Sequence, residues 1–250
     1  MHRFFVHDTG LSLQHITVGT TLALPEKVAH QVRDVLHLHS GEQLVLLDNS
    51  GAEFVVEVTR AERKLVEVQL VEQRAGKSES PVHIVLCQGL LKSARFELIL
   101  EKGTELGVSV FAPILCRRSI AGLEDAGPAK IARWQRILQE ATEQCGRSRL
   151  PQLLPIRPLK QALDELPDNA LTLIPWEEEH DTNLRVALQA HKQQQKTVVL
   201  FIGPEGGLTP EEIVLAQQHG VHSVTLGQRI LRAETAALAA VANVMYELEM

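Results

Sequence analysis

From residue 82 onward, short apolar segments alternate with longer segments of helical spacing, and this alternation restricts the fold more than any other feature. The expected strands are 82–87, 110–115, 171–174, 197–202 and 222–226, and the expected helices are 93–106, 129–145, 183–190, the segment after Thr209, and 234–248. Such alternation predicts an α/β domain with a largely parallel sheet and helices on both faces. Ligands in these sheets bind beyond the carboxyl ends of the strands, so the loops at 175–181, 203–208 and 227–233 are the candidate site.

The first 75 residues have a different pattern, with one short helix expected over 25–38 and otherwise strand-like segments. These are 43–47, 53–58 and 64–71, and a strong turn signal at 48–51 joins the first two. Short strands, tight turns and one helix predict a small β-barrel. The polar segment 75–81 lacks large apolar residues, so we expect one domain over 1–75 and a second over 76–250.

Residues 202–207, with the sequence IGPEGG, connect an expected buried strand to an expected helix. The three glycines allow a ligand to approach the backbone closely. Thr209, Pro210 and Glu212 suit the start of the helix, as N-cap, first helical residue and return arm of a capping box. Acidic side chains therefore occupy the positive end of the helix dipole, where a phosphate would meet like charge. We interpret the segment 203–208, the glycine loop, as a site for a ligand that places no phosphate there.

A second candidate segment, 226–236 with the sequence LGQRILRAETA, precedes the last expected helix. In one interpretation Glu234 and Thr235 only begin the helix, and the arginines are solvated. In the other, Ile230 and Leu231 contact a flat apolar ligand and Arg232 faces an anionic partner. Both interpretations remain open from the residues alone.

Basic residues gather at loop ends and along one helix border between 92 and 157, although the net charge is −6. That charge argues against indiscriminate nucleic-acid binding but allows a local basic face. Any one of these residues is typical of a solvated surface, whereas the group favours an RNA-facing patch. The candidates are Lys92, Arg95, Lys102, Arg117, Arg118, Arg147 and Arg149.

Several site types have no counterpart in the sequence. The dinucleotide, P-loop and nucleophile-elbow motifs are absent, and no apolar run has the length of a membrane span. Three cysteines without CxxC spacing favour a reducing cytoplasm. His37-x-His39 lacks further metal ligands, and 177–181 is typical of a solvated acidic loop, so we expect no metal.

Two further patterns concern helix packing. The alanine-rich last helix is small and apolar nearly all round, which predicts either a buried core helix or a close-packed homodimer interface. Gly103 lies in the middle of an apolar helical arc, where glycine costs roughly 1 kcal/mol relative to alanine. We therefore expect close packing against Gly103.

Five segments together resemble the small-subunit (16S) ribosomal RNA methyltransferases that modify a uridine at N3, within the SPOUT (trefoil-knot) class. They are 2–6 (HRFFV), 102–108 (KGTELGV), 140–147 (EATEQCGR), 202–207 and 226–236. The resemblance covers nearly the whole chain. It departs at His37, Gly103 and Cys145, where the family often has arginine, alanine and serine.

The resemblance implies a PUA-like RNA-binding barrel, then a deeply knotted α/β domain that forms a homodimer and binds S-adenosylmethionine. General topology rules would instead predict an unknotted, doubly wound sheet. S-adenosylmethionine contains no phosphate, which agrees with the acidic side chains at the start of the helix after Thr209. By position, the implied cofactor-binding residues are Ile174, Pro175, Ile202, Gly203, Pro204, Glu205, Gly206, Gly207, Leu226, Gly227, Ile230, Leu231, Thr235 and Ala236.

The implied reaction moves the sulfonium methyl group to N3 of a specific uridine after N3 has lost its proton. Arg232 is the first candidate for stabilising the uracil anion, and Arg3, supplied by a partner subunit, is the second. Glu143 and Glu234 are candidate proton acceptors, and the sequence does not decide between them. Two alternatives are a non-catalytic RNA-binding ribosome assembly factor with the same barrel and knot, and, more weakly, an enzyme acting on a small acidic metabolite.

Overall fold

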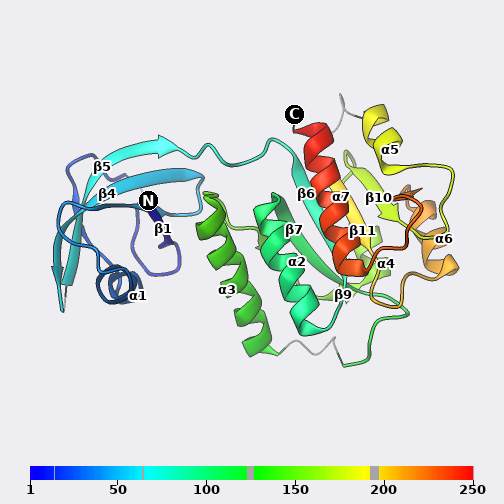
Figure 1. The fold of residues 1–250 in the computed structure, drawn as a ribbon, viewed down its shortest axis with the longest axis horizontal. Helices are drawn as coiled ribbons and strands as arrows, with labels where there is room; N and C mark the ends of the chain where they lie inside the picture. The colour runs from blue at the N-terminus through cyan, green and yellow to red at the C-terminus, as the bar shows by residue number, and fades with distance from the viewer. Residues whose placement is uncertain (14, 64, 123–126, 192–196, 250) are drawn as a thin grey trace. The chain divides into compact units, whose positions relative to one another are not determined.

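The computed structural model describes residues 1–13, 15–63, 65–122, 127–191 and 197–249 (Figure 1). The chain divides into two compact units. The first comprises Met1–Glu79 and Thr142–Leu150, and the second comprises Ser80–Ala141 and Pro151–Met250. No sequence pattern indicates that Thr142–Leu150 belongs with the N-terminal residues.

The first unit, within its described residues, is built on a five-stranded mixed sheet of order β1-β3-β4-β5-β2. β1 runs parallel to β3, and the other pairs are antiparallel. The expected helix is present as α1 (Glu26–His30), continued by a π-helical turn, η1 (Gln31–Val35). The strands are β1 (His2–Phe5), β2 (Thr21–Ala23), β3 (Gln43–Leu47), β4 (Ala52–Glu62) and β5 (Leu65–Ala75).

β3 shows why this part of the sequence is apolar rather than alternating. Leu44 and Leu46 enter the main core of the unit, whereas Val45 and Leu47 enter a second apolar cluster on the other face. A strand buried on both faces needs apolar residues throughout. The turn that follows places Asn49 at φ 67°, in the left-handed region that asparagine tolerates.

The second unit, in its described part, contains a seven-stranded sheet of order β12-β10-β11-β6-β7-β8, with β9 also beside β7. Every ladder in it is parallel, which confirms the largely parallel sheet expected from the alternation. The strands are β6 (His83–Gly89), β7 (Val108–Leu115), β8 (Gln152–Leu153), β9 (Arg157–Pro158), β10 (Leu171–Pro175), β11 (Thr197–Ile202) and β12 (His222–Val224).

Helices cover both faces of this sheet, as β11 illustrates (Figure 1). Leu200 belongs to a core shared with α2, α3, α5 and α7, whereas Phe201 belongs to a core shared with α4 and α6. Successive residues of a strand point to opposite faces, so both faces of β11 are buried. The helices are α2 (Ser93–Glu105), α3 (Pro128–Cys145), α4 (Leu159–Asp164), α5 (Leu184–His191), α6 (Pro210–Gln218) and α7 (Ala233–Leu248).

The close packing expected at Gly103 is present, whereas the last helix is buried on one face only. A Cβ atom on Gly103 would lie 2.9 Å from Phe111 Cε1, which confirms that α2 packs closely there. In α7, Ala237, Ala240 and Val244 are buried, but Ala242 and Tyr246 are exposed. α7 therefore leaves one face uncovered in the single chain. No helix in the described ranges is both long enough and apolar enough to cross a membrane.

Candidate functional site

Two hollows lie at the carboxyl ends of β10 and β11 in the second unit. The first hollow is lined by Pro175–Glu177, His180, residues 225–231 and Ala236. The second is lined by Pro175, Glu177, residues 202–208, residues 230–233 and Ala236. Because the two share Pro175, Glu177, Ile230, Leu231 and Ala236, they are neighbouring parts of one site. The site lies where ligands bind in parallel sheets.

Most residues expected to line a cofactor site do line these hollows. The exceptions are Ile174, which is buried in the core between the sheet and α6, and Thr235, which is exposed at the start of α7. The residues that line a hollow are Pro175, Ile202, Gly203, Pro204, Glu205, Gly206, Gly207, Leu226, Gly227, Ile230, Leu231 and Ala236.

The start of α6 has the expected capping box. Thr209 Oγ1 accepts a hydrogen bond from Glu212 N (3.3 Å), and Glu212 Oε2 accepts one from Thr209 N (2.9 Å). Glu212 Oε1 also accepts one from Arg117 N (2.8 Å). Because a carboxylate already occupies the positive end of α6, this helix start is unsuited to a phosphate.

Four of the residues expected to bind RNA surround the glycine loop. Arg95 pairs with Glu205 (3.1 Å) and with Glu234 (3.7 Å). Arg118 donates to two carbonyl groups of the glycine loop, and Lys92 N donates to Glu205 (3.5 Å). Arg117 has an exposed side chain beside Glu211 (3.6 Å).

The other three expected RNA-binding residues lie elsewhere. Lys102, near the end of α2, pairs with Glu101 and Glu105, and its hydrogen bonds to them raise the pKa of its ammonium group. Arg147 and Arg149 belong to the first unit. Arg147 is only 7% exposed and pairs with Glu79 (3.1 Å), whereas Arg149 is exposed.

The four catalytic candidates divide between the two units. Arg232 precedes α7, lines the second hollow and is exposed, and it forms no ion pair with any residue that the structure describes. The side chain of Glu234 is 14% exposed, and its Oε2 is buried without a hydrogen-bond partner among the described atoms. In the first unit, Arg3 pairs with Glu53 (2.8 Å), and Glu143 accepts a hydrogen bond from Phe5 N (3.0 Å).

Glu177 is a candidate functional residue that the sequence interpretation assigned to a solvated acidic loop. It lines both hollows, and its Oε1 lies 2.9 Å from the position of a Cβ atom on Gly207. Glu179 fixes the same loop by accepting hydrogen bonds from Ser223 Oγ, Asp181 N and Thr182 N, and the Ser223 bond is the main cause of its lowered pKa. The loop 175–181 is a candidate site loop because it follows a strand, but the acidic run within it is also typical of a solvated loop and so hides the place of Glu177 in the site.

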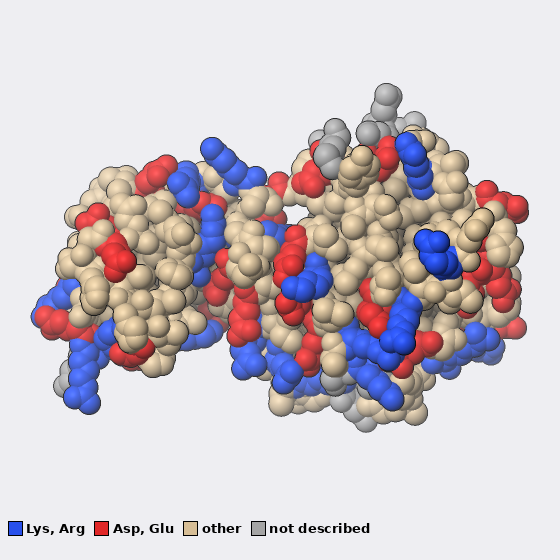
Figure 2. All heavy atoms as spheres, viewed as in Figure 1, with Lys and Arg blue, Asp and Glu red and all other residues tan. Residues whose placement is uncertain are grey.

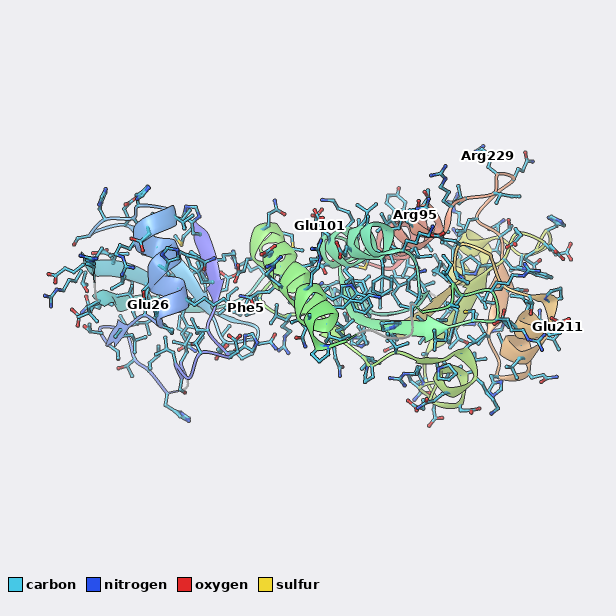
Figure 3. All side chains as sticks on the ribbon, turned by 90° about the horizontal axis from the view of Figure 1, so that it is seen from below. Phe5, Glu26, Arg95, Glu101, Glu211 and Arg229 are labelled. Atoms are coloured by element: carbon cyan, nitrogen blue, oxygen red, sulfur yellow. The ribbon has the colours of Figure 1, made fainter. Side chains whose placement is uncertain are left out.

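The loop before α7 forms the outer edge of the first hollow. Ile230 is 85% exposed, and Figure 3 shows Arg229 pointing away from the ribbon at the outside of this loop. Figure 2 shows basic side chains gathering below the start of α7, with acidic side chains among them. The exposed Arg229 and Arg232 therefore bring positive charge to the residues that line the site, and Glu177 and Glu205 bring negative charge.

Comparisons with known proteins identify the family. A model described as an RNA methyltransferase domain matches residues 78–245. Ribosomal RNA small subunit methyltransferase E of Bacillus subtilis (strain 168) is 30% identical over all of this chain and 98% of its own length. The corresponding protein of Synechocystis is 31% identical over 93% of this chain and 75% of its own length.

A solved structure is similar over nearly the whole chain. The ribosomal RNA small subunit methyltransferase E of Neisseria gonorrhoeae, bound to S-adenosyl methionine, is 32% identical with a TM-score of 0.86, and the match covers 98% of this chain and 97% of that one. The family model, the two relatives and the solved structure all indicate the same family. The chain belongs to the RNA methyltransferase family that includes the ribosomal RNA small subunit methyltransferases E.

Proposed function

We propose that this protein transfers a methyl group from S-adenosylmethionine to N3 of a specific uridine in small-subunit (16S) ribosomal RNA. The observation that carries the proposal is the pair of hollows at the strand ends. They are lined by most of the residues that the family resemblance implies, in a chain whose fold matches a structure bound to this cofactor.

The residues of the hollows fit this cofactor. Leu231, Ile230 and Ala236 offer apolar surface for an adenine, and Glu177 offers a carboxylate for hydroxyl or ammonium groups. The capped start of α6 disfavours a phosphate, and the cofactor has none. When bound, S-adenosylmethionine supplies an electrophilic methyl group on a sulfonium.

Arg232 is the residue that we assign to the uracil anion. It lies at the rim with no acidic partner among the described residues, so its charge is available to a base that has lost its N3 proton. Holding the two reactants in line can contribute up to roughly 7–11 kcal/mol by analogy with intramolecular reactions. Glu234 is the better-supported proton acceptor, because it lies in the same unit as Arg232 and its Oε2 has no hydrogen-bond partner among the described atoms, whereas Glu143 lies in the first unit.

The proposal includes the finer features of the fold. Residues 1–75 would form the PUA-like RNA-binding barrel, supported by the five-stranded sheet, and 76–250 the knotted SPOUT domain. The knot is supported by the path of α7, which follows β12 at the sheet edge yet packs against α2 and β11. Arg3 would act from a partner subunit of a homodimer, in a cytoplasm consistent with three free cysteines.

The test uses labelled S-adenosylmethionine and small ribosomal subunits that lack the modification. We expect the wild-type protein to label the ribosomal RNA and Arg232→Ala to abolish labelling while retaining cofactor affinity by calorimetry. Arg136→Ala, on the exposed surface of α3, is the matched control and should methylate normally. Wild-type protein that binds the subunit without labelling it would favour the assembly-factor alternative, and label in a small molecule would favour the metabolite enzyme.

A further inference from the structure

The second half of the glycine loop is held by one arginine from another part of the chain. Arg118 Nη1 donates to Gly206 O (3.1 Å) and to Leu208 O (3.4 Å). Between these two carbonyl groups lies Gly207, whose φ of 72° is in the left-handed region. A single guanidinium group therefore joins both sides of the turn that shapes the second hollow.

Arg118 itself sits on a turn that is fixed from both sides. Cys116 N donates to Ser119 Oγ (2.9 Å), and Ser119 N donates to Cys116 O (3.0 Å). Arg117 N is bound by Glu212 at the start of α6. A Cβ atom on Gly206 would lie 2.9 Å from Arg118 Cβ, so the turn also contacts the glycine loop directly. The arginine is thus attached to a rigid support.

Other elements hold the rest of the glycine loop. Gln88, at the end of β6 and 1% exposed, donates through Nε2 to Gly203 O (3.4 Å). Glu205 is held by Arg95 on α2 and by the N–H group of Lys92. Three separate elements therefore contact three successive parts of the loop, and Arg118 is the contact for its C-terminal half.

We propose that Arg118 is a positioning residue that holds the glycine loop in its ligand-binding shape before the cofactor arrives. A loop with three glycines has many conformations. The apparent affinity for the cofactor is the intrinsic affinity multiplied by the fraction of molecules in which the loop is correctly formed. Hydrogen bonds from a charged donor are strong enough to set this fraction. The inference rests on the proposed function, and it gives Arg118 a task other than RNA contact.

The test measures cofactor affinity without RNA. We expect Arg118→Ala to weaken the calorimetric Kd for S-adenosylmethionine about tenfold. Arg118→Lys should have an intermediate Kd, because the ammonium group keeps the charge but the shorter side chain reaches the two carbonyl groups less well. Arg117→Ala is the matched control: this neighbouring side chain is 71% exposed, and its removal should leave the cofactor Kd unchanged. If Arg118→Ala does not fold, Arg118→Lys carries the same comparison.

A second readout needs no ligand. In the apo protein, we expect the amides of residues 206–208 to exchange hydrogen faster in Arg118→Ala than in the wild type or Arg117→Ala. Unchanged cofactor affinity with a raised KM for RNA would overturn the inference and assign Arg118 to RNA binding. Wild-type protein that does not bind S-adenosylmethionine would refute the proposed function instead. Hydrogen exchange would then still decide whether Arg118 holds the loop.

Discussion

At the scale of single residues, the partner of a side chain determines its role more than its type does. Arg118, Arg95 and Arg147 are all basic and lie near loop ends, yet their partners differ. In the structure Arg118 binds carbonyl groups, Arg95 binds two glutamates, and Arg147 is buried against Glu79. Arg147 and Glu79 are 68 positions apart in the chain. These partners, and not the positive charge that the three side chains share, determine what each side chain does.

Gly89 gives a prediction at this scale. A Cβ atom there would lie 2.5 Å from Pro204 N and 2.8 Å from Gly203 C, and these backbone atoms cannot rotate away. We expect Gly89→Ala to lower the free energy of unfolding by about 1–3 kcal/mol and to weaken cofactor binding, because it displaces the glycine loop. Denaturant unfolding and calorimetry measure the two effects.

The matched control for this prediction is Gly127→Ala. A Cβ atom on Gly127 would meet no atom of the described residues within 4 Å, and Gly127 does not have a positive φ. The control should therefore have the stability and cofactor affinity of the wild type. If Gly89→Ala behaves like the control, β6 does not restrict the glycine loop through this contact.

At the scale of elements, segments with a clear apolar pattern could be predicted, and strands of only two residues could not. β3 and β11 begin and end where the sequence indicates, and α6 begins with the predicted capping box. β8 and β9, with two residues each, were not predicted. Two residues show no periodicity, and both strands form only because β7 offers them a backbone edge for pairing.

Glu53 connects three strands of the first unit and gives a pH prediction. Its carboxylate, on β4, accepts hydrogen bonds from Arg3 on β1 (2.8 Å) and Arg74 on β5 (2.9 Å). Burial acts to raise the pKa of Glu53, but these two arginines outweigh it and lower the pKa below its ordinary value of 4.5. A lowered pKa in the folded state contributes stability above pH 4.5, and this contribution is lost as the pH falls through the folded value.

We expect Glu53→Gln to lower the free energy of unfolding of the first unit at pH 7 by on the order of 3 kcal/mol. The difference from the wild type should shrink below pH 4.5, because the wild-type carboxyl then becomes protonated. Glu72→Gln is the control, since Glu72 is more exposed and pairs with Arg74 at 3.6 Å, and should change stability by less than about 1 kcal/mol. A pH-independent difference would show that Glu53 acts through packing instead.

At the scale of the whole molecule, the sequence supports the two architectures but not every assignment of segments to them. A strand-rich N-terminal part and an α/β remainder follow from the change in periodicity near residue 75. The assignment of Thr142–Leu150 to the first unit depends on contacts such as Ser148 N and Arg149 N with Glu79 (2.9 Å each). The hollows likewise require that the ends of β10 and β11 lie side by side. The order in which the strands pair determines this, and the periodicity of the sequence does not reveal that order.

The uncovered face of α7 gives a prediction about assembly. Tyr246 is 68% exposed, and Ala242 and Asn243 are exposed beside it, while the opposite face of the helix is in the core. In the homodimer that we propose, small residues on α7 would let a second copy pack closely against this face. We expect the wild type to sediment as a dimer and Tyr246→Glu to sediment as a monomer, because a charge would be buried without a partner.

Val214→Glu is the control for this experiment. Val214 is 51% exposed on α6, so a carboxylate at this position leaves the face of α7 unchanged and should leave the sedimenting mass unchanged. The same two variants also test whether Arg3 acts from the partner subunit. If Arg3 acts from the partner subunit, Tyr246→Glu should lose methylation together with the dimer while keeping its own hollows. A monomeric variant that methylates at the wild-type rate would exclude the partner subunit from the reaction, and with it any role for an Arg3 supplied by that subunit.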